Sequence, residues 1–149
     1  MLKAYQALQG REIWKHDGTF IEKYQPTFGP GVKERFAFAK TVHDKDLTEQ
    51  ELLCEQAVRH INGLLADSSV LILPTLPGAG LKLDCSPDDM NAFRSKMSAS
   101  FCLVGLAGVP WITLPLAEID GAPLGVSLVS ACGTDAWLLE LSKALVQNR

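Results

Sequence analysis

The chain has 149 residues, of which 47% are apolar and 21% charged, and its formal net charge is −3. This length suits a single domain, residues 1–149, and the composition argues against disorder. Acidic and basic residues are mixed along the chain without a basic patch, so nucleic acid is not an expected partner. No apolar run approaches the roughly 20 residues of a membrane helix, and the first residues lack a signal-peptide pattern. We therefore expect no membrane partner.

The cysteines and histidines are scattered rather than clustered. They are Cys54, Cys85, Cys102, Cys132, His16, His43 and His60. No two cysteines have the Cys-x-x-Cys spacing, so a zinc site would need distant segments to converge. Isolated cysteines with apolar neighbours are typical of small buried side chains in a reducing compartment. We expect a cytoplasmic protein that uses no metal and no cofactor.

The N-terminal segment has apolar residues at helical spacing, which predicts a helix over residues 2–15. His16 beside Asp17 could form a catalytic dyad. Adjacent residues rarely aim at one point, however, and a histidine followed by Gly18 is typical of a helix C-terminus. A loop rich in proline and glycine is predicted over residues 19–31.

Two further helices are predicted next, a short one over residues 32–40 and a longer one over residues 49–66. Thr48 and Glu51 have the spacing of a capping box, in which each side chain satisfies the other residue's backbone amide. The expected inward stripe of the longer helix consists of Leu53, Ala57, Ile61, Leu64 and Leu65.

A continuous apolar run, residues 70–73, predicts a strand that is buried on both faces. Pro74 ends it, and a connector rich in glycine and proline follows over residues 76–87. Ligands of open sheets bind at strand ends, so Thr75 is a candidate residue of a substrate-binding pocket wall. The alternative is that Thr75 only caps the strand.

The next predicted helix runs from Pro87 to Gly108, with Ser86 as its N-cap. Asp88 and Asp89 could form a metal or acid–base pair, but acidic residues at a helix start are usually solvated charges that favour the helix dipole. The expected core stripe of this helix consists of Phe93, Met97, Phe101 and Val104.

The C-terminal part contains two β runs, residues 111–114 and 124–129, separated by a polar turn at 118–122. Their closeness predicts a hairpin. Thr134 is expected to cap the last helix. Large apolar side chains expected in the core of this part are Leu138, Leu141, Leu145, Trp111 and Trp137.

Several ordered segments resemble the amidase signature family, and together they span nearly the whole chain. They are Trp-Lys-His-Asp-Gly (14–18), Phe-Gly-Pro-Gly-Val-Lys-Glu-Arg (28–35), Val-Leu-Ile-Leu-Pro-Thr-Leu-Pro (70–77), Ala-Gly-Val-Pro-Trp-Ile-Thr-Leu-Pro (107–115), Gly-Ala-Pro-Leu-Gly-Val-Ser-Leu-Val (121–129) and Gly-Thr-Asp-Ala-Trp-Leu-Leu (133–139). The two earliest segments are similar to the indoleacetamide hydrolase-like branch. The resemblance implies an α/β fold, a mixed β-sheet flanked by helices, as part of the amidase signature fold.

Members of this family hydrolyse amides, or transfer the amide nitrogen, with a serine nucleophile, a cis-bonded serine and a lysine. In the family these residues precede the region matched here. The chain contains no Gly-Ser-Ser-Gly-Gly-like run, and the cluster Ser95, Ser98 and Ser100 lacks neighbouring glycines. We therefore assign no catalytic residue.

The resemblance implies the C-terminal portion of an enzyme that converts a carboxylic amide to an acid and ammonia, inactive alone because the nucleophile region is absent. A non-catalytic interaction or scaffold domain with an amidase-derived fold is the alternative, and an unrelated α/β domain is a third interpretation. Cutting the shared sheet would leave an unpaired strand edge, so we expect a homo-oligomer or a requirement for the missing N-terminal catalytic portion.

Overall fold

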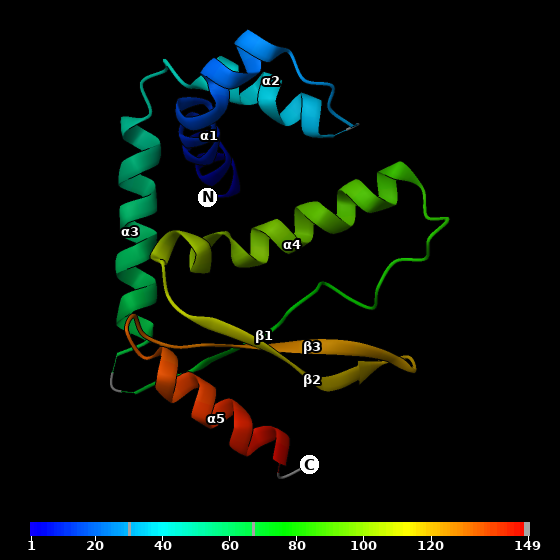
Figure 1. The fold of residues 1–149 in the computed structure, drawn as a ribbon. Coiled ribbons are helices and arrows are strands. Elements are labelled where there is room, and N and C mark those ends of the chain that lie inside the picture. The colour runs from blue at the N-terminus through cyan, green and yellow to red at the C-terminus, as the bar shows by residue number, and fades with distance from the viewer. Residues whose placement is uncertain (30, 67, 148–149) are drawn as a thin grey trace. The chain divides into compact units, whose positions relative to one another are not determined.

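A computed structural model describes residues 1–29, 31–66 and 68–147. The chain divides into two compact units, Met1–Gln56 and Ala57–Arg149. The expectation of a single domain stays a prediction. The helices and strands (Figure 1) are α1 (Leu2–Tyr24), α2 (Val32–Val42), α3 (Thr48–Leu64), β1 (Leu71–Pro74), α4 (Pro87–Ala107), β2 (Trp111–Ile119), β3 (Ala122–Val129) and α5 (Asp135–Gln147). In the described ranges, no helix has the length and apolarity needed to span a bilayer.

Close packing of α1 against α2 builds the first unit, and Gly10 permits it. A Cβ atom at Gly10 would lie 3.0 Å from Cγ2 of Val42 and 3.4 Å from Cα of Ala39. The glycine weakens the helix intrinsically but lets the two backbones approach. An ion pair between Lys40 and Glu22, 2.8 Å long, also joins the two helices.

Helix α1 is longer than predicted, because Gly18 lies inside the helix rather than at its end. The buried Trp14 packs across Gly18, where a Cβ atom would lie only 2.8 Å from the indole Nε1. The helix ends at Tyr24, and its C-cap residue, Gln25, has a left-handed backbone with φ 44°. The predicted helix end and the predicted loop start at residue 19 are therefore wrong, and residue 30 of that loop lies outside the described residues.

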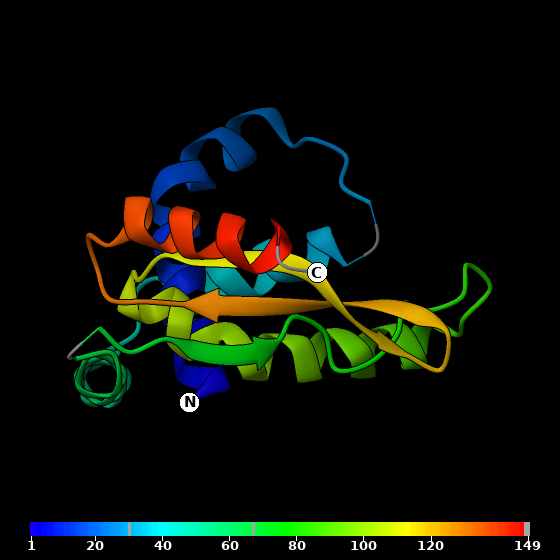
Figure 2. The same ribbon diagram turned by 90° about the horizontal axis from the view of Figure 1, so that it is seen from below.

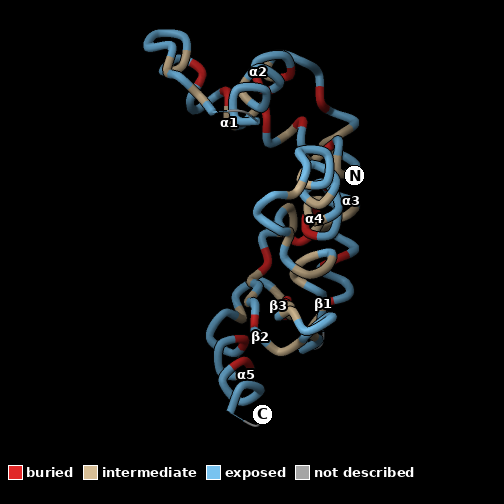
Figure 3. Tube along the Cα trace, turned by 90° about the vertical axis from the view of Figure 1, so that its right-hand side faces the viewer, coloured by how far each residue is buried: buried red, intermediate tan, exposed pale blue. Residues whose placement is uncertain are grey.

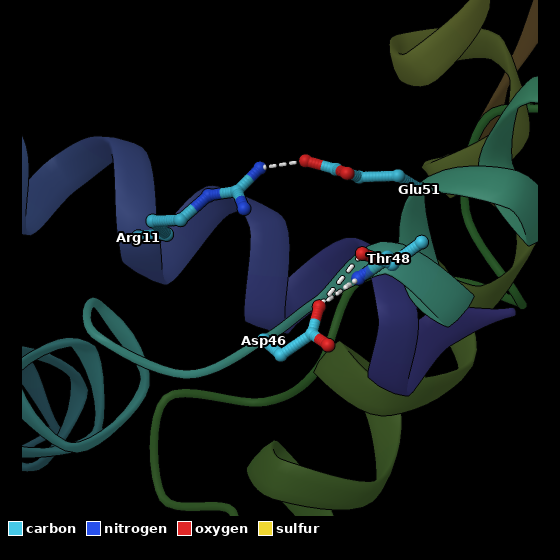
Figure 4. Close-up of polar contacts among 4 residues, drawn as sticks. All are labelled: Arg11, Asp46, Thr48 and Glu51. Atoms are coloured by element: carbon cyan, nitrogen blue, oxygen red, sulfur yellow. Dashed lines mark hydrogen bonds and ion pairs between the residues drawn. The ribbon is translucent and has the colours of Figure 1, made fainter.

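The start of α3 is organised differently from the predicted capping box (Figure 4). Thr48 donates both its backbone N–H and its hydroxyl to Asp46, at 3.0 Å and 2.7 Å. The Glu51 carboxylate forms an ion pair with Arg11 of α1. The capping-box prediction is wrong because the acidic residue two positions before Thr48 takes its hydrogen bonds.

The buried face of α3 is narrower than the predicted stripe. Ile61 and Leu65 are buried in the core, as predicted, whereas Leu53 and Leu64 are 40% and 47% exposed. Ile61 and Leu65 are four residues apart, which is the spacing of one helix face. Both pack in the hydrophobic cluster that contains Val129 of β3. The prediction that Leu53 and Leu64 lie in the core is therefore wrong.

A three-stranded sheet, ordered β1-β3-β2, forms the centre of the second unit. Both strand pairs are antiparallel. Helix α4 lies on one face of the sheet and α5 on the other (Figures 1 and 2). The predicted α/β class is confirmed, although the described strands pair only in the antiparallel sense.

The predicted hairpin of β2 and β3 is confirmed, with a tighter turn and longer strands. Its turn is Asp120–Gly121, where φ is 51° and 77°, as in a two-residue type I′ hairpin. Pro115 does not end β2, because a register shift between Leu114 and Ala117 absorbs it.

Central strand β3 contributes to a hydrophobic cluster on each face of the sheet. Figure 3 marks the buried residues in red along the trace of the chain. Neighbouring residues of a strand point to opposite faces, so Val129 and Leu128 belong to different clusters. The buried partners of Val129 are Ile61, Leu65, Val104 and Val109. Those of Leu128 are Leu114 and Leu138.

Three side chains that were expected in the core lie at the surface instead. Trp111 is 50% exposed, Trp137 43% and Leu145 41%. Trp111 is the first residue of β2, which is an edge strand of the sheet. Trp137 and Leu145 lie on sides of α5 that the sheet does not cover fully.

The predicted N-cap of α4 is confirmed. The Ser86 hydroxyl accepts a 3.0 Å hydrogen bond from the backbone amide of Asp89.

Strand β1 is an edge strand of the sheet, and one of its faces is exposed, which contradicts the prediction that both faces are buried. Ile72 is 69% exposed. The Thr75 amide donates to the Gly125 carbonyl, so alternate backbone groups of β1 turn toward β3. The amides of Val70 and Ile72 consequently point to the open edge, where Pro74 has no N–H to offer.

The hydrogen bonds that Asp46 accepts from Thr48 lower the pKa of its carboxyl group, and this effect can be tested. The Thr48 hydroxyl, and next the Thr48 amide, lower the pKa of the Asp46 carboxyl. This carboxylate stabilises the fold above its ordinary pKa, and the contribution disappears as the pH falls through the lowered native value. Thr48→Val should raise the Asp46 pKa toward its ordinary value in a carboxyl-carbon NMR titration. Thr41→Val, which removes a hydroxyl bonded to Phe38 instead, should leave it unchanged.

Candidate functional site

Three hydroxyl side chains meet on one face of the sheet, and we call them the hydroxyl cluster: Thr75, directly after β1, Thr113 of β2 and Ser127 of β3. The Oγ atoms of Thr75 and Ser127 are 2.8 Å apart. Those of Thr113 and Ser127 are 3.1 Å apart, and the contact from Thr75 to Thr113 is the longest, at 3.4 Å. The cluster is therefore centred on Ser127 of β3.

Strand register and a glycine bring these side chains together. Thr113 and Ser127 face each other across β2 and β3, and the antiparallel ladder places them in a pair without mutual backbone bonds, where side chains lie closest. The 2.9 Å bond from the Thr75 amide to Gly125 fixes the third member. A Cβ atom at Gly125 would lie 2.7 Å from Thr113 Cγ2 and 2.8 Å from Thr75 Oγ1. Only glycine leaves space for both threonines there.

The cluster is graded from buried to accessible. Ser127 is fully buried, Thr75 is half-buried and Thr113 is exposed. Each hydroxyl can donate one hydrogen bond and accept two. Among the described residues, no charged side chain forms a hydrogen bond with the cluster. The site is therefore neutral, and it has both donors and acceptors within reach of solvent.

Thr75 was predicted as a pocket-wall residue, and the structure places it in the hydroxyl cluster instead of lining the nearby pocket. That open pocket, of about 520 Å³, lies between the connector after β1 and one face of α4. Its charged lining residues are Lys82, Asp84, Asp89 and Lys96. The pocket begins at Pro77, two residues beyond Thr75. The substrate-binding role of Thr75 stays a prediction.

Two of the other residues considered as chemical candidates, Asp89 and Ser100, have structural roles. Asp89 accepts a 2.6 Å bond from the Ser86 hydroxyl, which fixes the start of α4. Ser100 donates its hydroxyl to the Lys96 carbonyl within α4. Within residues 1–29, 31–66 and 68–147, no three potential ligands among histidine, cysteine, aspartate and glutamate gather closely enough to hold a metal ion.

Thr113 and Ser127 were not predicted as site residues. Each is a polar residue within an apolar β run, which is a signal for a polar contact on a sheet face. Their partnership depends on the hairpin register, and that register depends on a two-residue turn that is shorter than the predicted turn at 118–122. Thr75 joins only through the pairing of β1 with β3.

The chain is homologous to amidases. It is 30% identical to Amidase 1 of Arabidopsis thaliana over 93% of this chain and 32% of that protein. It is 29% identical to a glutamyl-tRNA(Gln) amidotransferase subunit of Syntrophomonas wolfei over 81% of this chain and 26% of that protein. No family model matches the chain.

The fold is also that of part of an amidase. A crystal structure of an amidase superimposes with a TM-score of 0.78 and 23% identity, over 98% of this chain and 35% of that one. The chain thus spans about a third of the length of these proteins.

The crowding at Gly125 can be tested by substitution. Gly125→Ala should lower the free energy of unfolding by about 1–3 kcal/mol, because the new methyl group must displace Thr75 and Thr113. Chemical denaturation would measure the change. Gly63→Ala, at a helical position with nothing within 4 Å, should be neutral or stabilising. Equal stability of Gly125→Ala and the unmodified chain would contradict the assigned packing.

Proposed function

We propose that this chain is a C-terminal part of an amidase signature enzyme that hydrolyses a carboxylic amide to an acid and ammonia. The observation that carries the proposal is homology to an amidase along 93% of the chain, with the same fold over 98% of it. The chain supplies the sheet and the hydroxyl cluster at the end of β1. The exposed Thr113 of this cluster supports a place beside the substrate.

The chain is inactive by itself in this proposal. Amide hydrolysis by a serine enzyme needs a nucleophile held next to a base. The sequence lacks a Gly-Ser-Ser-Gly-Gly-like run, and among the described residues no serine or threonine hydroxyl bonds a lysine or histidine nitrogen. The serines of α4 are part of a regular helix.

The partner of the chain is proposed to be either a second copy or the catalytic portion of the amidase. The exposed edge of β1 supports this, because edges without charged residues tend to pair with other strands. One relative is named as a component of an amidotransferase, which is consistent with action inside an assembly. We place the protein in the cytoplasm and keep the indoleacetamide hydrolase-like branch as the proposed substrate group.

A second candidate function is a non-catalytic interaction domain that retains the amidase-derived fold. The exposed apolar side chains of β1 and α5 favour it, especially Ile72, Trp137 and Leu139. The two candidates differ in one outcome. If the chain is an enzyme part, joining it to the missing catalytic portion should give hydrolysis of amide substrates, and if it is an interaction domain, it should not.

Activity assays test the first proposal. The chain alone should release no ammonia from indoleacetamide or from simple amides in a coupled ammonia assay, because its described residues form no nucleophile–base pair. Addition of the catalytic portion of a related amidase should restore release if the chain is an enzyme part. Continued inactivity of that assembled complex would favour the interaction domain.

A serine-reactive probe supplies the control. We expect no stoichiometric labelling of Ser95, Ser98 or Ser100 by mass spectrometry. Labelling of any of these residues, together with ammonia release, would overturn the assignment of the nucleophile to sequence outside this chain.

Association is tested at the edge of β1. The unmodified chain should self-associate in light scattering. Ile72→Lys should shift the population toward monomer, because a charge on the edge opposes strand pairing. Leu83→Lys, at a fully exposed position in the connector, should leave the population unchanged. A monodisperse monomer over a wide concentration range would contradict the association.

A further inference from the structure

The hydroxyl cluster has features of a binding site beyond those of a packing contact. A sheet face next to a hydrophobic cluster would normally carry apolar side chains, yet Thr75, Thr113 and Ser127 all place hydroxyls here. A fourth position, Gly125, has no side chain, and any Cβ atom there would clash with both threonines. Four positions, one directly after β1 and three in β2 and β3, thus combine to bring three hydroxyls together.

The hydrogen-bond arithmetic leaves capacity for a ligand. Three hydroxyls carry three protons, and the two short contacts, Thr113 to Ser127 and Ser127 to Thr75, use two of them. The third contact is long, at 3.4 Å, so it is the weakest of the set. A ligand acceptor can take the place of this contact and accept a hydrogen bond from the hydroxyl at the end of the chain. The remaining lone pairs can accept a donor from the same ligand.

The charge of the site selects the ligand class. No cationic side chain hydrogen-bonds to the cluster within the described ranges, so a carboxylate would lose water without gaining a counter-charge. A neutral carboxamide carries both an acceptor oxygen and a donor NH₂ group, which matches the paired capacity of the hydroxyls.

We propose that Thr75, Thr113 and Ser127 bind the neutral carboxamide group of a ligand and discriminate against the corresponding carboxylate. The inference rests on the proposed function for the identity of the amide as substrate. In that setting the cluster holds the substrate and releases the product, because hydrolysis turns a neutral amide into an anion. Ser127 is the buried centre that orients the two threonines, and Thr113 is the accessible member.

The test uses the full chain and a matched pair of small probes. Propionamide and propionate have nearly the same shape and differ in charge. In two-dimensional ¹H–¹⁵N NMR titrations, propionamide should shift the backbone amides of Thr75, Thr113 and Ser127, and propionate at the same concentration should not. Equal shifts with both probes, or no shift of these amides with propionamide, would overturn the proposal.

Variants connect the shifts to the hydroxyls. Thr113→Val keeps the shape of an exposed side chain and should weaken propionamide binding by about two- to ten-fold, the value of one neutral hydrogen bond. Thr75→Val should act in the same direction. Ser100→Ala removes a hydroxyl from α4 and should leave binding unchanged. If Thr113→Val and Thr75→Val, folded by their spectra, bind like the unmodified chain, the hydroxyls are not the site.

Ammonia measured in the same samples separates this inference from the proposed function. Selective propionamide binding without ammonia release supports the cluster, whatever the activity of the assembled enzyme. An active assembled enzyme with no amide shifts at the cluster supports the amidase assignment and overturns the binding site.

Discussion

The pairing of β3 with both of its neighbours is the constraint on which the second unit depends. Its backbone groups alternate between β1 and β2, and its side chains alternate between the two faces of the sheet. Val129 and Leu128 therefore enter two separate hydrophobic clusters, while Ser127 lies next to them in the hydroxyl cluster. A shift of one residue in this register would bury different side chains and would separate the hydroxyls.

Local signals in the sequence predicted most of the elements. The hairpin, the start of α4 at Ser86 and the helices over residues 32–40 and 49–66 follow from turn chemistry, capping and periodicity. The errors occur where a contact between distant residues decides the outcome. Gly18 has the pattern of a helix end, but Trp14 covers it within a longer helix. Glu51 has the spacing of half a capping box, but it pairs with Arg11.

The candidate site was less predictable than the fold for the same reason. Thr75 was identified because it follows a strand, a feature of neighbouring residues. Thr113 and Ser127 lie 14 residues apart, and Thr75 lies 52 residues from Ser127. Their meeting depends on strand register and on the missing side chain at Gly125. Burial of β1 was overestimated because an apolar run does not show whether other elements cover both faces of the strand.

The proline in β1 has a consequence for the fate of the chain when its partner is absent. Growth of a fibril by strand addition needs an unbroken row of donors and acceptors along each new edge. On the open side of β1 the amides of Val70 and Ile72 are available, but the row is broken at Pro74. An added strand can therefore form only a short ladder. The edge can hold one specific neighbour and yet is a poor template for unlimited polymerisation.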